Sequence, residues 1–243
     1  MGLSEMLARL QRSGQFMRNV TSWEAMPAQP ARTVPFPSGL DPWLASQLQA
    51  GGISQLYTHQ AAVWESTQAH RHTVVVTPTA SGKTLCYNLP VLDNLRRSPA
   101  ATALYLFPTK ALAQDQLAEL QSLLTDSPEL RAAIYDGDTP QANRKAIRTA
   151  ARLLISNPDM LHTGILPHHT RWARFLSQLR FVVIDELHTY RGIFGSHFAN
   201  VLRRLRRVCR FYGSQPLFIC SSATIANPQQ LAEMLIEEPL ELI

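Results

Sequence analysis

The chain has 243 residues, of which 45% are hydrophobic and 17% are charged, and its 23 Lys and Arg against 18 Asp and Glu give a formal net charge of +5. This composition can bury a sizeable core and lies far from that of disordered chains. No run of residues reaches the roughly 20 apolar positions of a membrane helix, and the first residues lack the pattern of a secretory signal, so we expect a soluble cytoplasmic protein with no membrane partner.

The three cysteines indicate a reducing environment. Cys86, Cys209 and Cys220 lie far apart and form no C-x-x-C pair, so the sequence suggests neither a structural zinc site nor a redox dithiol. Reduced thiols inside the core are the ordinary role of such residues. The mildly basic charge permits an acidic polymer as a partner but does not identify one.

Residues 1–40 are predicted to form an N-terminal extension. It begins with apolar residues that recur at helical spacing, which predicts a short amphipathic helix: Leu3, Met6, Leu7 and Leu10. A proline-rich stretch over residues 22–38 follows and predicts an extended arm. Asp41 and Pro42 then fit a helix cap followed by Pro at the first helical position. We therefore expect the compact domain to comprise residues 41–243.

From residue 41 onwards, short apolar runs alternate with helical patterns. This alternation is typical of βαβ units and predicts an α/β fold, a three-layer sandwich with a mainly parallel sheet. Helices are expected between the strands, among them one after Lys110 and one over residues 198–212. The runs that we expect to form strands are 73–77, 103–107, 132–135, 153–156, 181–184 and 217–220.

A phosphate-binding loop is predicted where the first of these strands ends. Residues 77–84 read T-P-T-A-S-G-K-T, and ligands of α/β sheets bind at the carboxyl ends of strands, where backbone N–H groups can hold phosphate. Lys83 would reach the phosphates and the hydroxyl of Thr84 would bind Mg²⁺. Thr77 departs from G-x-x-x-x-G-K-[ST], and a purely structural turn is the alternative. The expected ATP-binding residues of the loop are Thr79, Ala80, Ser81, Gly82, Lys83 and Thr84.

A pair of carboxylates follows the strand predicted over residues 181–184. Asp185 at a strand end can hold Mg²⁺, and Glu186, on the other side of the pleat, can polarise an attacking water. Alone, the pair would suggest a polar strand end that caps a helix. Together with the loop over residues 77–84 it indicates a P-loop ATPase, in which Lys83, Asp185 and Glu186 are the expected catalytic residues and Thr84 and Asp185 the expected metal ligands.

Four segments, in their order along the chain, resemble the motifs of the first RecA-like domain of a superfamily-two DExH-box helicase. Residues 185–188 read D-E-L-H, residues 77–84 match the variant phosphate loop of that family, and residues 222–224 read S-A-T. Residues 56–60, L-Y-T-H-Q, resemble the Q motif. The resemblance implies that Gln60 reads the adenine edge, and that three residues couple nucleotide state to strand grip: His188, Ser222 and Thr224.

Three further strand ends resemble the segments with which this family grips a nucleic-acid backbone. They are residues 107–110, 136–138 and 156–159. Taken singly, each would be an ordinary turn or helix cap, but N–H groups at helix starts and Thr and Lys side chains suit phosphates. The residues so implied in nucleic-acid binding are Pro108, Thr109, Lys110, Asp136, Gly137, Asn157, Pro158 and Asp159.

A finer likeness points to MrfA-type DNA-repair helicases, which are related to RecQ. It lies in residues 185–197, D-E-L-H-T-Y-R-G-I-F-G-S-H, and residues 32–37, R-T-V-P-F-P. It implies 3′ to 5′ movement on DNA, with a single strand or a duplex junction as partner and ATP and Mg²⁺ as cofactors. It also implies a second RecA-like domain, in cis or in trans, that supplies an arginine finger. Only 19 residues follow Thr224, so we expect this chain alone to hydrolyse ATP slowly.

Other interpretations stay open. A non-catalytic module could hold ATP or nucleic acid and act through a partner, and an RNA helicase domain would grip the same phosphates. A P-loop kinase or transporter ATPase is disfavoured by Gln60 and by residues 222–224. Trp43 could cover the adenine. Five arginines on the helix expected over residues 198–212 could form either a solvated face or a DNA-binding one: Arg203, Arg204, Arg206, Arg207 and Arg210.

Overall fold

A computed structural model describes residues 2–24, 30–78, 81–125, 127 and 129–243, so the predicted loop residues Thr79 and Ala80 lie outside the described residues. The chain forms two compact units, residues 1–31 and 32–243. The first contains α1 (Leu3–Arg12) and α2 (Gly14–Met17), and α1 is the predicted amphipathic helix. In the part of the chain that is described, every helix is too short or too polar to cross a lipid bilayer.

The second unit begins earlier than the sequence predicts. Strand β1 (Thr33–Val34) pairs antiparallel with β2 (Leu56–Tyr57), so residues that the sequence assigned to the extension belong to the compact unit. Helix α3 (Pro42–Ala50) starts where expected, because the side chain of Asp41 accepts the N–H of Leu44 at 3.1 Å. The arm is therefore joined to the domain by backbone pairing, which its proline content concealed.

Seven parallel strands form the main sheet, in the order β5-β6-β4-β7-β8-β3-β9. The six predicted strands are present, with ends that differ by one or two residues. The seventh, β9, was not predicted because two residues are too few to make an apolar run. The strands are β3 (Thr73–Val76), β4 (Thr102–Leu106), β5 (Ala132–Ile134), β6 (Leu153–Ser156), β7 (Leu179–Ile184), β8 (Leu217–Ser222) and β9 (Glu241–Leu242).

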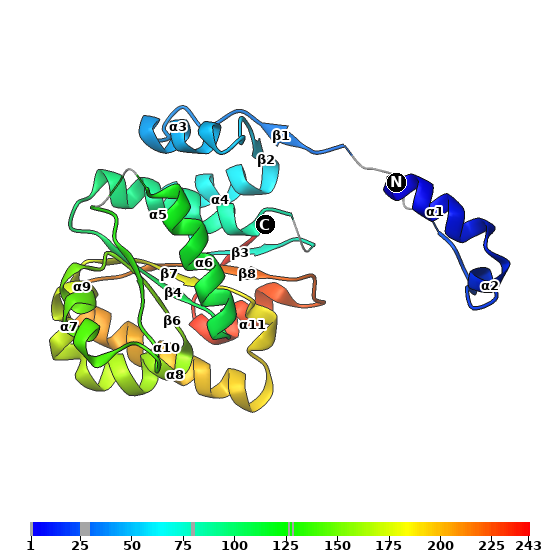
Figure 1. Ribbon diagram of the computed structural model, residues 1–243. Coiled ribbons are helices and arrows are strands. Elements are labelled where there is room, and N and C mark those ends of the chain that lie inside the picture. The colour runs from blue at the N-terminus through cyan, green and yellow to red at the C-terminus, as the bar shows by residue number, and fades with distance from the viewer. Residues whose placement is uncertain (1, 25–29, 79–80, 126, 128) are drawn as a thin grey trace. The chain divides into compact units, whose positions relative to one another are not determined.

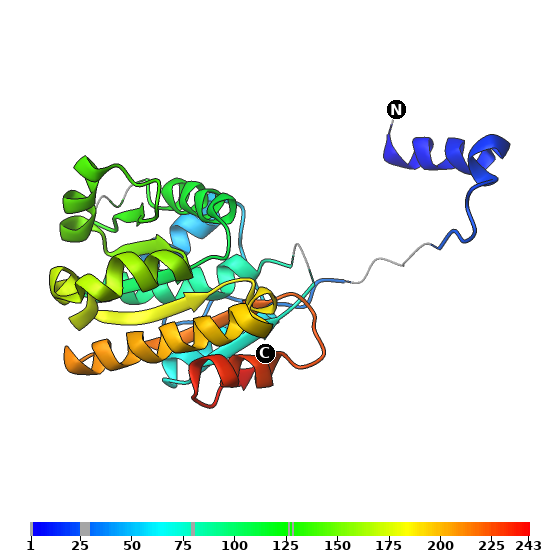
Figure 2. The same ribbon diagram turned by 90° about the horizontal axis from the view of Figure 1, so that it is seen from below.

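Helices connect these strands and cover both faces of the sheet, so the predicted three-layer α/β architecture is confirmed (Figures 1 and 2). Short 3₁₀ or π turns lie at Leu161–Ile165, Leu166–Trp172 and Leu187–Thr189. The helices of this unit after α3 are α4 (Thr58–Gln68), α5 (Lys83–Arg97), α6 (Lys110–Leu123), α7 (Gln141–Ala150), α8 (Pro158–Met160), α9 (Ala173–Ser177), α10 (Gly192–Phe211) and α11 (Pro228–Ile236).

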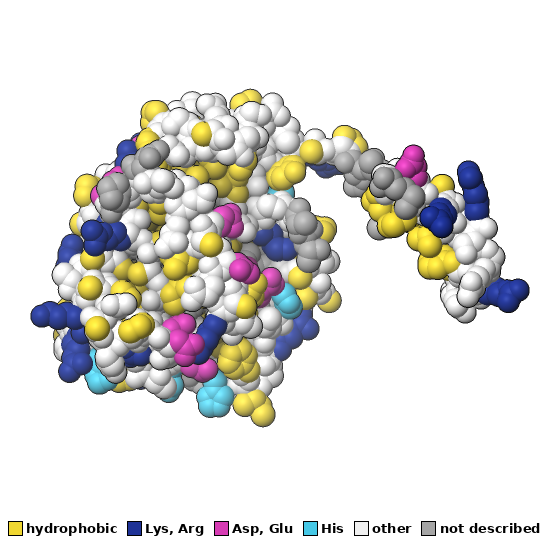
Figure 3. Space-filling model, viewed as in Figure 1, with side chains coloured by type: hydrophobic (Ala, Val, Ile, Leu, Met, Phe, Trp, Pro, Cys, Tyr) yellow, Lys and Arg dark blue, Asp and Glu magenta, His cyan; other side chains and the backbone are white. Residues whose placement is uncertain are grey.

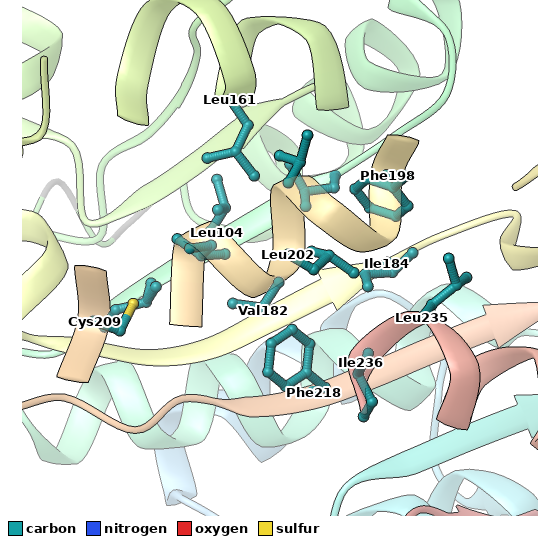
Figure 4. Close-up of a cluster of buried hydrophobic side chains, with 14 of the residues drawn as sticks. Leu104, Leu161, Val182, Ile184, Phe198, Leu202, Cys209, Phe218, Leu235 and Ile236 are labelled. Atoms are coloured by element: carbon teal, nitrogen blue, oxygen red, sulfur yellow. The ribbon is translucent and has the colours of Figure 1, made fainter. Parts of the chain in front are cut away.

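Alternate side chains of each strand enter one of two cores. In β7, Val182 and Ile184 pack on the side of α10 and α11, whereas Phe181 and Val183 pack on the side of α4, α5 and α6. Figure 4 shows Val182 and Ile184 beside Leu202 of α10. Each fully buried aliphatic side chain of this kind contributes roughly 1.5–3 kcal/mol of transfer free energy, so the two cores fix the sheet between its helices.

The cysteines lie in these cores, as the sequence indicates. All three are free and buried. Burial raises the pKa of the Cys86 and Cys220 thiols to about 12 and that of Cys209 to about 11. They therefore stay protonated and unreactive at neutral pH.

The parallel register places the predicted motifs side by side. Ile184 at the end of β7 lies opposite Leu106 of β4 and Cys220 of β8, and Val76 of β3 lies opposite Ser222. Parallel strands all present their carboxyl ends to one edge, where α/β proteins bind ligands. The loops after β3, β4, β5, β6, β7 and β8 therefore share one edge of the sheet.

Candidate functional site

The described residues of the loop between β3 and α5 place a glycine and then Lys83 at the start of the helix. Gly82 caps α5 with φ +76°, in the left-handed region that favours glycine. Lys83 folds back over the loop, and its Nζ donates to the carbonyl oxygens of Thr77 and Pro78, both at 3.0 Å. The ammonium group thus lies over the turn that precedes the helix, where the sequence placed it.

Thr77 gains a role that its departure from the motif did not suggest. Its hydroxyl is hydrogen-bonded to the hydroxyl of Ser81, which joins the two ends of the described part of the loop. A glycine at this position could not make that bond. The threonine therefore replaces a flexible turn residue with a side-chain link across the loop.

Gln60 and His59 hold the phosphate loop from the start of α4. The amide of Gln60 is 3% exposed; its Oε1 accepts the N–H of Tyr57 at 2.8 Å, and its Nε2 donates to the carbonyl of Gly82 at 3.0 Å. His59 Nε2 lies 3.0 Å from the carbonyl oxygen of Ser81. Burial lowers the pKa of His59, the bond to Ser81 opposes that shift, and the charge of Lys83 adds to it.

This arrangement gives Gln60 a structural task beside the predicted one. Both ends of its amide contact the protein's own backbone, so the residue fixes the loop before any adenine arrives. Trp43 lies elsewhere: the guanidinium of Arg96 is 4.6 Å from its ring centre, and Arg96 is near the far end of α5, about 20 Å from the loop at 1.5 Å per residue. The hypothesis that Trp43 covers the adenine is therefore wrong.

Asp185, at the end of β7, has hydrogen-bonding neighbours in three directions. Its Oδ1 accepts the N–H of Glu186 at 2.8 Å and the hydroxyl of Ser221, and its Oδ2 lies 3.2 Å from the hydroxyl of Tyr87. Burial, and then the charge of Asp185, raise the pKa of Tyr87 well above its ordinary value, while a hydrogen bond with Thr84 opposes the shift. Asp185 therefore lies beside a buried hydroxyl of α5, the helix whose first turn carries Thr84, the other predicted metal-binding residue.

Glu186 is held in an uncommon backbone conformation next to His188. Its φ is +51°, in the left-handed region that a non-glycine residue enters at a cost of about 1 to 2 kcal/mol. Its Oε2 lies 3.2 Å from His188 Nδ1. The turn directs the carboxylate to the histidine and away from the bonds that hold Asp185.

The predicted coupling residues meet through a backbone group. His188 Nδ1 lies 3.4 Å from the N–H of Ala223 as well as near Glu186. A neutral imidazole nitrogen either donates or accepts, so the tautomer selects one of these two partners. Ser222 donates to the carbonyl of Ala223 at 2.9 Å, and Thr224 is exposed. The D-E-L-H and S-A-T segments therefore touch at Ala223, between the two residues that the sequence indicated.

The predicted strand-gripping residues lie at the same edge. Thr109 and Asn157 cap α6 and α8: Thr109 Oγ1 accepts the N–H of Leu112 at 3.4 Å, and Asn157 Oδ1 accepts that of Met160 at 2.8 Å. Pro108 is half-buried before α6. Pro158 occupies the first turn of α8, where its missing N–H costs nothing. Both helix starts thus follow strand ends.

The loop after β5 meets the start of α6 through an ion pair. The exposed Lys110 places Nζ 2.6 Å from Asp138 Oδ2. Asp136 is buried and accepts the N–H of Asp138 at 3.0 Å, whereas Gly137 and Asp159 are exposed. In Figure 3 acidic side chains, with basic and histidine side chains beside them, gather on this unit to the right of α6.

The arginines of α10 divide into two groups. Arg203 pairs with Glu237 at 2.6 Å, and Arg206 and Arg210 pair with Glu238. The other two, Arg204 and Arg207, have no ion pair among the described residues. They line a cavity of about 380 Å³ together with His169, Val208 and Phe211.

Three buried residues of the site were missed by sequence reasoning: Tyr87, Gln116 and Ser221. Tyr87 donates to Gln116 Oε1 at 2.7 Å and also reaches Asp185. The serine that binds Asp185 is Ser221, one residue before the predicted Ser222. Tyr87 follows Thr84 by three positions on α5, one helical turn, and this spacing is the sequence signal that could have indicated it.

The fold and the site together define a P-loop nucleotide-hydrolase domain of the RecA-like kind. A lysine-bearing loop follows one parallel strand, and an Asp-Glu pair follows another at the same edge. The chain belongs to the DEAD/DEAH box helicase family, which matches residues 57–231. The predicted family is therefore confirmed.

Several relatives place the chain within this family. It is 52% identical over 226 residues to the uncharacterized ATP-dependent helicase YprA of Bacillus subtilis, a match that covers 93% of this chain and 30% of that protein. It is 45% identical over 207 residues to the ATP-dependent helicase HRQ1 of Saccharomyces cerevisiae, covering 83% and 19%. The chain thus spans less than a third of these relatives.

Solved structures agree. The crystal structure of the DUF1998 helicase MrfA bound to DNA and AMPPNP has a TM-score of 0.94 and 50% sequence identity, and the match covers 100% of this chain and 34% of that one. The Mycobacterium smegmatis helicase Lhr bound to ssDNA and AMP-PNP has a TM-score of 0.74 at 26% identity, covering 85% and 28%. The likeness to MrfA-type helicases is confirmed.

Proposed function

We propose that this chain is the ATP-binding motor domain of an ATP-dependent 3′ to 5′ DNA helicase that acts in DNA repair. One observation carries the proposal: the loop with Lys83, the pair Asp185-Glu186 and the strand-gripping loops share one edge of a parallel sheet. The relatives named ATP-dependent helicases, and MrfA bound to DNA, support it.

The nucleotide end of the site suits ATP and Mg²⁺. A threonine hydroxyl and a carboxylate are the hard oxygen donors that Mg²⁺ prefers, and Thr84 lies in the first turn of the helix whose Tyr87 hydroxyl is 3.2 Å from Asp185. The ion, when bound, neutralises phosphate charge. Lys83, which the loop carbonyls hold in place, binds phosphate oxygens at the same turn.

Hydrolysis needs a base, and we assign this role to Glu186. Asp185 has three hydrogen-bonding neighbours, whereas the Glu186 carboxylate faces His188. Glu186 would accept the proton of the attacking water. His188 then links that base to Ala223 and the segment after β8, so a change at Glu186 alters which partner the imidazole keeps.

The other end of the edge would hold a nucleic-acid backbone. The helix starts at Thr109 and Asn157 offer N–H groups, and Lys110 adds a charge. These groups contact phosphates and not bases, so they do not distinguish DNA from RNA. The proposal of DNA rests on the relatives alone. A second RecA-like domain, in cis or in trans, would complete the nucleotide site with an arginine finger.

A charge-removing substitution tests the enzymatic proposal. Glu186→Gln should lower nucleic-acid-stimulated ATPase activity by about 10²-fold or more, the usual contribution of a general base, while nucleotide binding persists. Glu65→Gln, on the exposed side of α4, is the matched control. Equal ATP turnover by Glu186→Gln and the unchanged chain would instead identify a non-catalytic binding module.

Nucleic-acid type and polarity need separate measurements. DNA and RNA oligonucleotides of one sequence should differ in how strongly they stimulate the ATPase, with DNA the stronger. Duplexes with a 3′ or a 5′ single-stranded tail, unwound by this domain together with its second half, test the direction of movement. Preference for RNA, or for a 5′ tail, would contradict the corresponding part of the proposal.

A further inference from the structure

A buried chain of polar groups connects α6 to Asp185 and has no part in the chemistry described above. The hydroxyl of Tyr87 donates to Gln116 Oε1 at 2.7 Å and lies 3.2 Å from Asp185 Oδ2. Tyr87 is 1% exposed and Gln116 is 4% exposed, so water does not compete for these contacts. The three residues come from α5, α6 and the end of β7, and therefore join separate elements.

Counting hydrogens shows that these three polar side chains can be hydrogen-bonded in two ways. A tyrosine hydroxyl carries one hydrogen. While it donates to Gln116, no hydrogen lies between Tyr87 and Asp185. In this arrangement Gln116 Nε2 is buried and has no partner among the described residues.

Rotating the terminal amide of Gln116 by half a turn exchanges its oxygen and nitrogen. Nε2 then donates to the oxygen of Tyr87, and the Tyr87 hydroxyl is released to donate to Asp185 Oδ2. Both arrangements use the same heavy atoms at the same positions. They differ in that Asp185 accepts two hydrogen bonds in the first and three in the second.

The position of α6 bears on this choice. Gln116 lies on the buried face of α6 with Ala113 and Leu120, and the helix begins at the strand-gripping residues Thr109 and Lys110. A displacement of the start of α6 moves Gln116 relative to Tyr87, because a helix of this length moves as a rigid rod. The contact at 2.7 Å then lengthens or turns, and Asp185 gains or loses its third bond.

We propose that Tyr87 and Gln116 are positioning residues that link the strand-gripping start of α6 to the metal-binding carboxylate of Asp185. This inference rests on the proposed function, since it assigns nucleic acid to one end of the chain of contacts and nucleotide with Mg²⁺ to the other. Neither residue touches the reacting atoms. Their effect is on the orientation of Asp185 and on how that orientation responds to a bound strand.

The test compares variants of Tyr87 and Gln116, the two residues of the proposed relay to Asp185, with a matched control. Tyr87→Phe removes one buried hydroxyl, and Gln116→Leu removes the amide. Tyr105→Phe removes another buried hydroxyl, which donates to Asn88 at 2.9 Å from a ring 5.4 Å from that of Tyr87. A fluorescent ATP analogue is titrated with Mg²⁺, and then with and without a single-stranded oligonucleotide. Thermal unfolding checks that each variant folds.

Three results are expected. Tyr87→Phe removes the donor of the third bond to Asp185 in the second arrangement, and it should raise the Mg²⁺ concentration for half-maximal nucleotide binding about tenfold, since a lost hydrogen bond to a carboxylate is worth about 1.4 kcal/mol or more. Gln116→Leu should not raise that concentration, because the Tyr87 hydroxyl is then always free to donate to Asp185. Both should abolish the change in nucleotide affinity that the oligonucleotide causes, whereas Tyr105→Phe should keep both properties.

The outcomes separate the inference from the proposed function. If Tyr87→Phe matches Tyr105→Phe in Mg²⁺ requirement, or if Gln116→Leu retains the oligonucleotide effect, the relay is overturned while the proposed function stands. If the unchanged chain binds no nucleotide with Mg²⁺, both fall together. A lower unfolding temperature shared by Tyr87→Phe and Tyr105→Phe reflects only the lost buried hydroxyl, and the Mg²⁺ comparison between them still decides.

Discussion

Gly82→Ala is the substitution whose cost the structure defines most closely. Gly82 has φ +76°, and a Cβ built there would lie 2.6 Å from Gln60 Nε2. Two costs follow. An L-residue in the left-handed region costs about 1 to 2 kcal/mol, and Gln60 must withdraw and lose its bond to the Gly82 carbonyl, about 1 kcal/mol.

An opposing effect comes from the unfolded chain. Replacing glycine with alanine reduces the conformational freedom of the unfolded state and stabilises the fold by about 0.4–1 kcal/mol. The net expectation is a loss of about 2 kcal/mol in the free energy of unfolding. Urea unfolding followed by circular dichroism measures it, and a midpoint shift at constant slope identifies a change in stability.

Gly213→Ala separates the two costs. Gly213 has φ +80° but no atom within 4 Å of the position of its added Cβ, so it carries the backbone cost alone. Gly82→Ala should be about 1 kcal/mol more destabilising, and this excess should vanish when Gln60 is also replaced by alanine. Equal losses for Gly82→Ala and Gly213→Ala would refute the reasoning that Gln60 holds the loop.

Three further predictions concern stability and strand binding. Burial, and then a nearby arginine, lower the pKa of His72 below its ordinary 6.5, so the unfolded chain takes up the proton first as pH falls and the stability of the fold declines below about pH 6.5. His72→Gln should flatten that decline, as measured by urea titrations at several pH values. Joint replacement of Arg204 and Arg207 by alanine should weaken DNA binding and reduce its salt dependence by about one to two charges. Arg203→Ala should not weaken DNA binding, because Arg203 is already paired with Glu237; unchanged affinity in both variants would show that this face is only solvated. Gly195→Ala should cost about 3 kcal/mol or more by thermal unfolding, because its Cβ would meet a backbone carbonyl oxygen at 2.5 Å and backbone yields less than a side chain; a loss below 1 kcal/mol would show that α10 can move away.

The sequence predicted the parts of the fold that repeat a simple pattern. Six strands were found because each is a short apolar run beside a turn, and the parallel order placed their motifs at one edge. The strands that were missed, β1, β2 and β9, have two residues each, too few for any period. Helix α10 starts at Gly192, not at the predicted residue 198, because two glycines of low helix propensity conceal its first turn.

The site shows the same division between local pattern and long-range contact. Asp185 and Glu186 were predicted because they follow β7 directly, and Lys83 because its loop follows β3 directly. Tyr87 and Gln116 were not, because their contacts join residues 29 and 98 positions apart in the chain. No local signal records which buried hydroxyl meets which carboxylate, since that depends on how α5 and α6 pack over β7.

The register of the sheet also bears on how such a domain could move a strand. The loops after β3, β4, β5 and β6 all belong to one parallel sheet, in which β7 and β8 lie between β4 and β3, and β4, β7 and β8 keep the same pairing along their lengths after Ala103. Their spacing is therefore fixed by the backbone ladder. Translocation needs two bodies whose separation changes with nucleotide state, and one rigid edge provides one of them. We infer that the remaining change within this domain is a small displacement of α6 on the face of the sheet, which the contacts of Gln116 and Tyr87 would carry to Asp185.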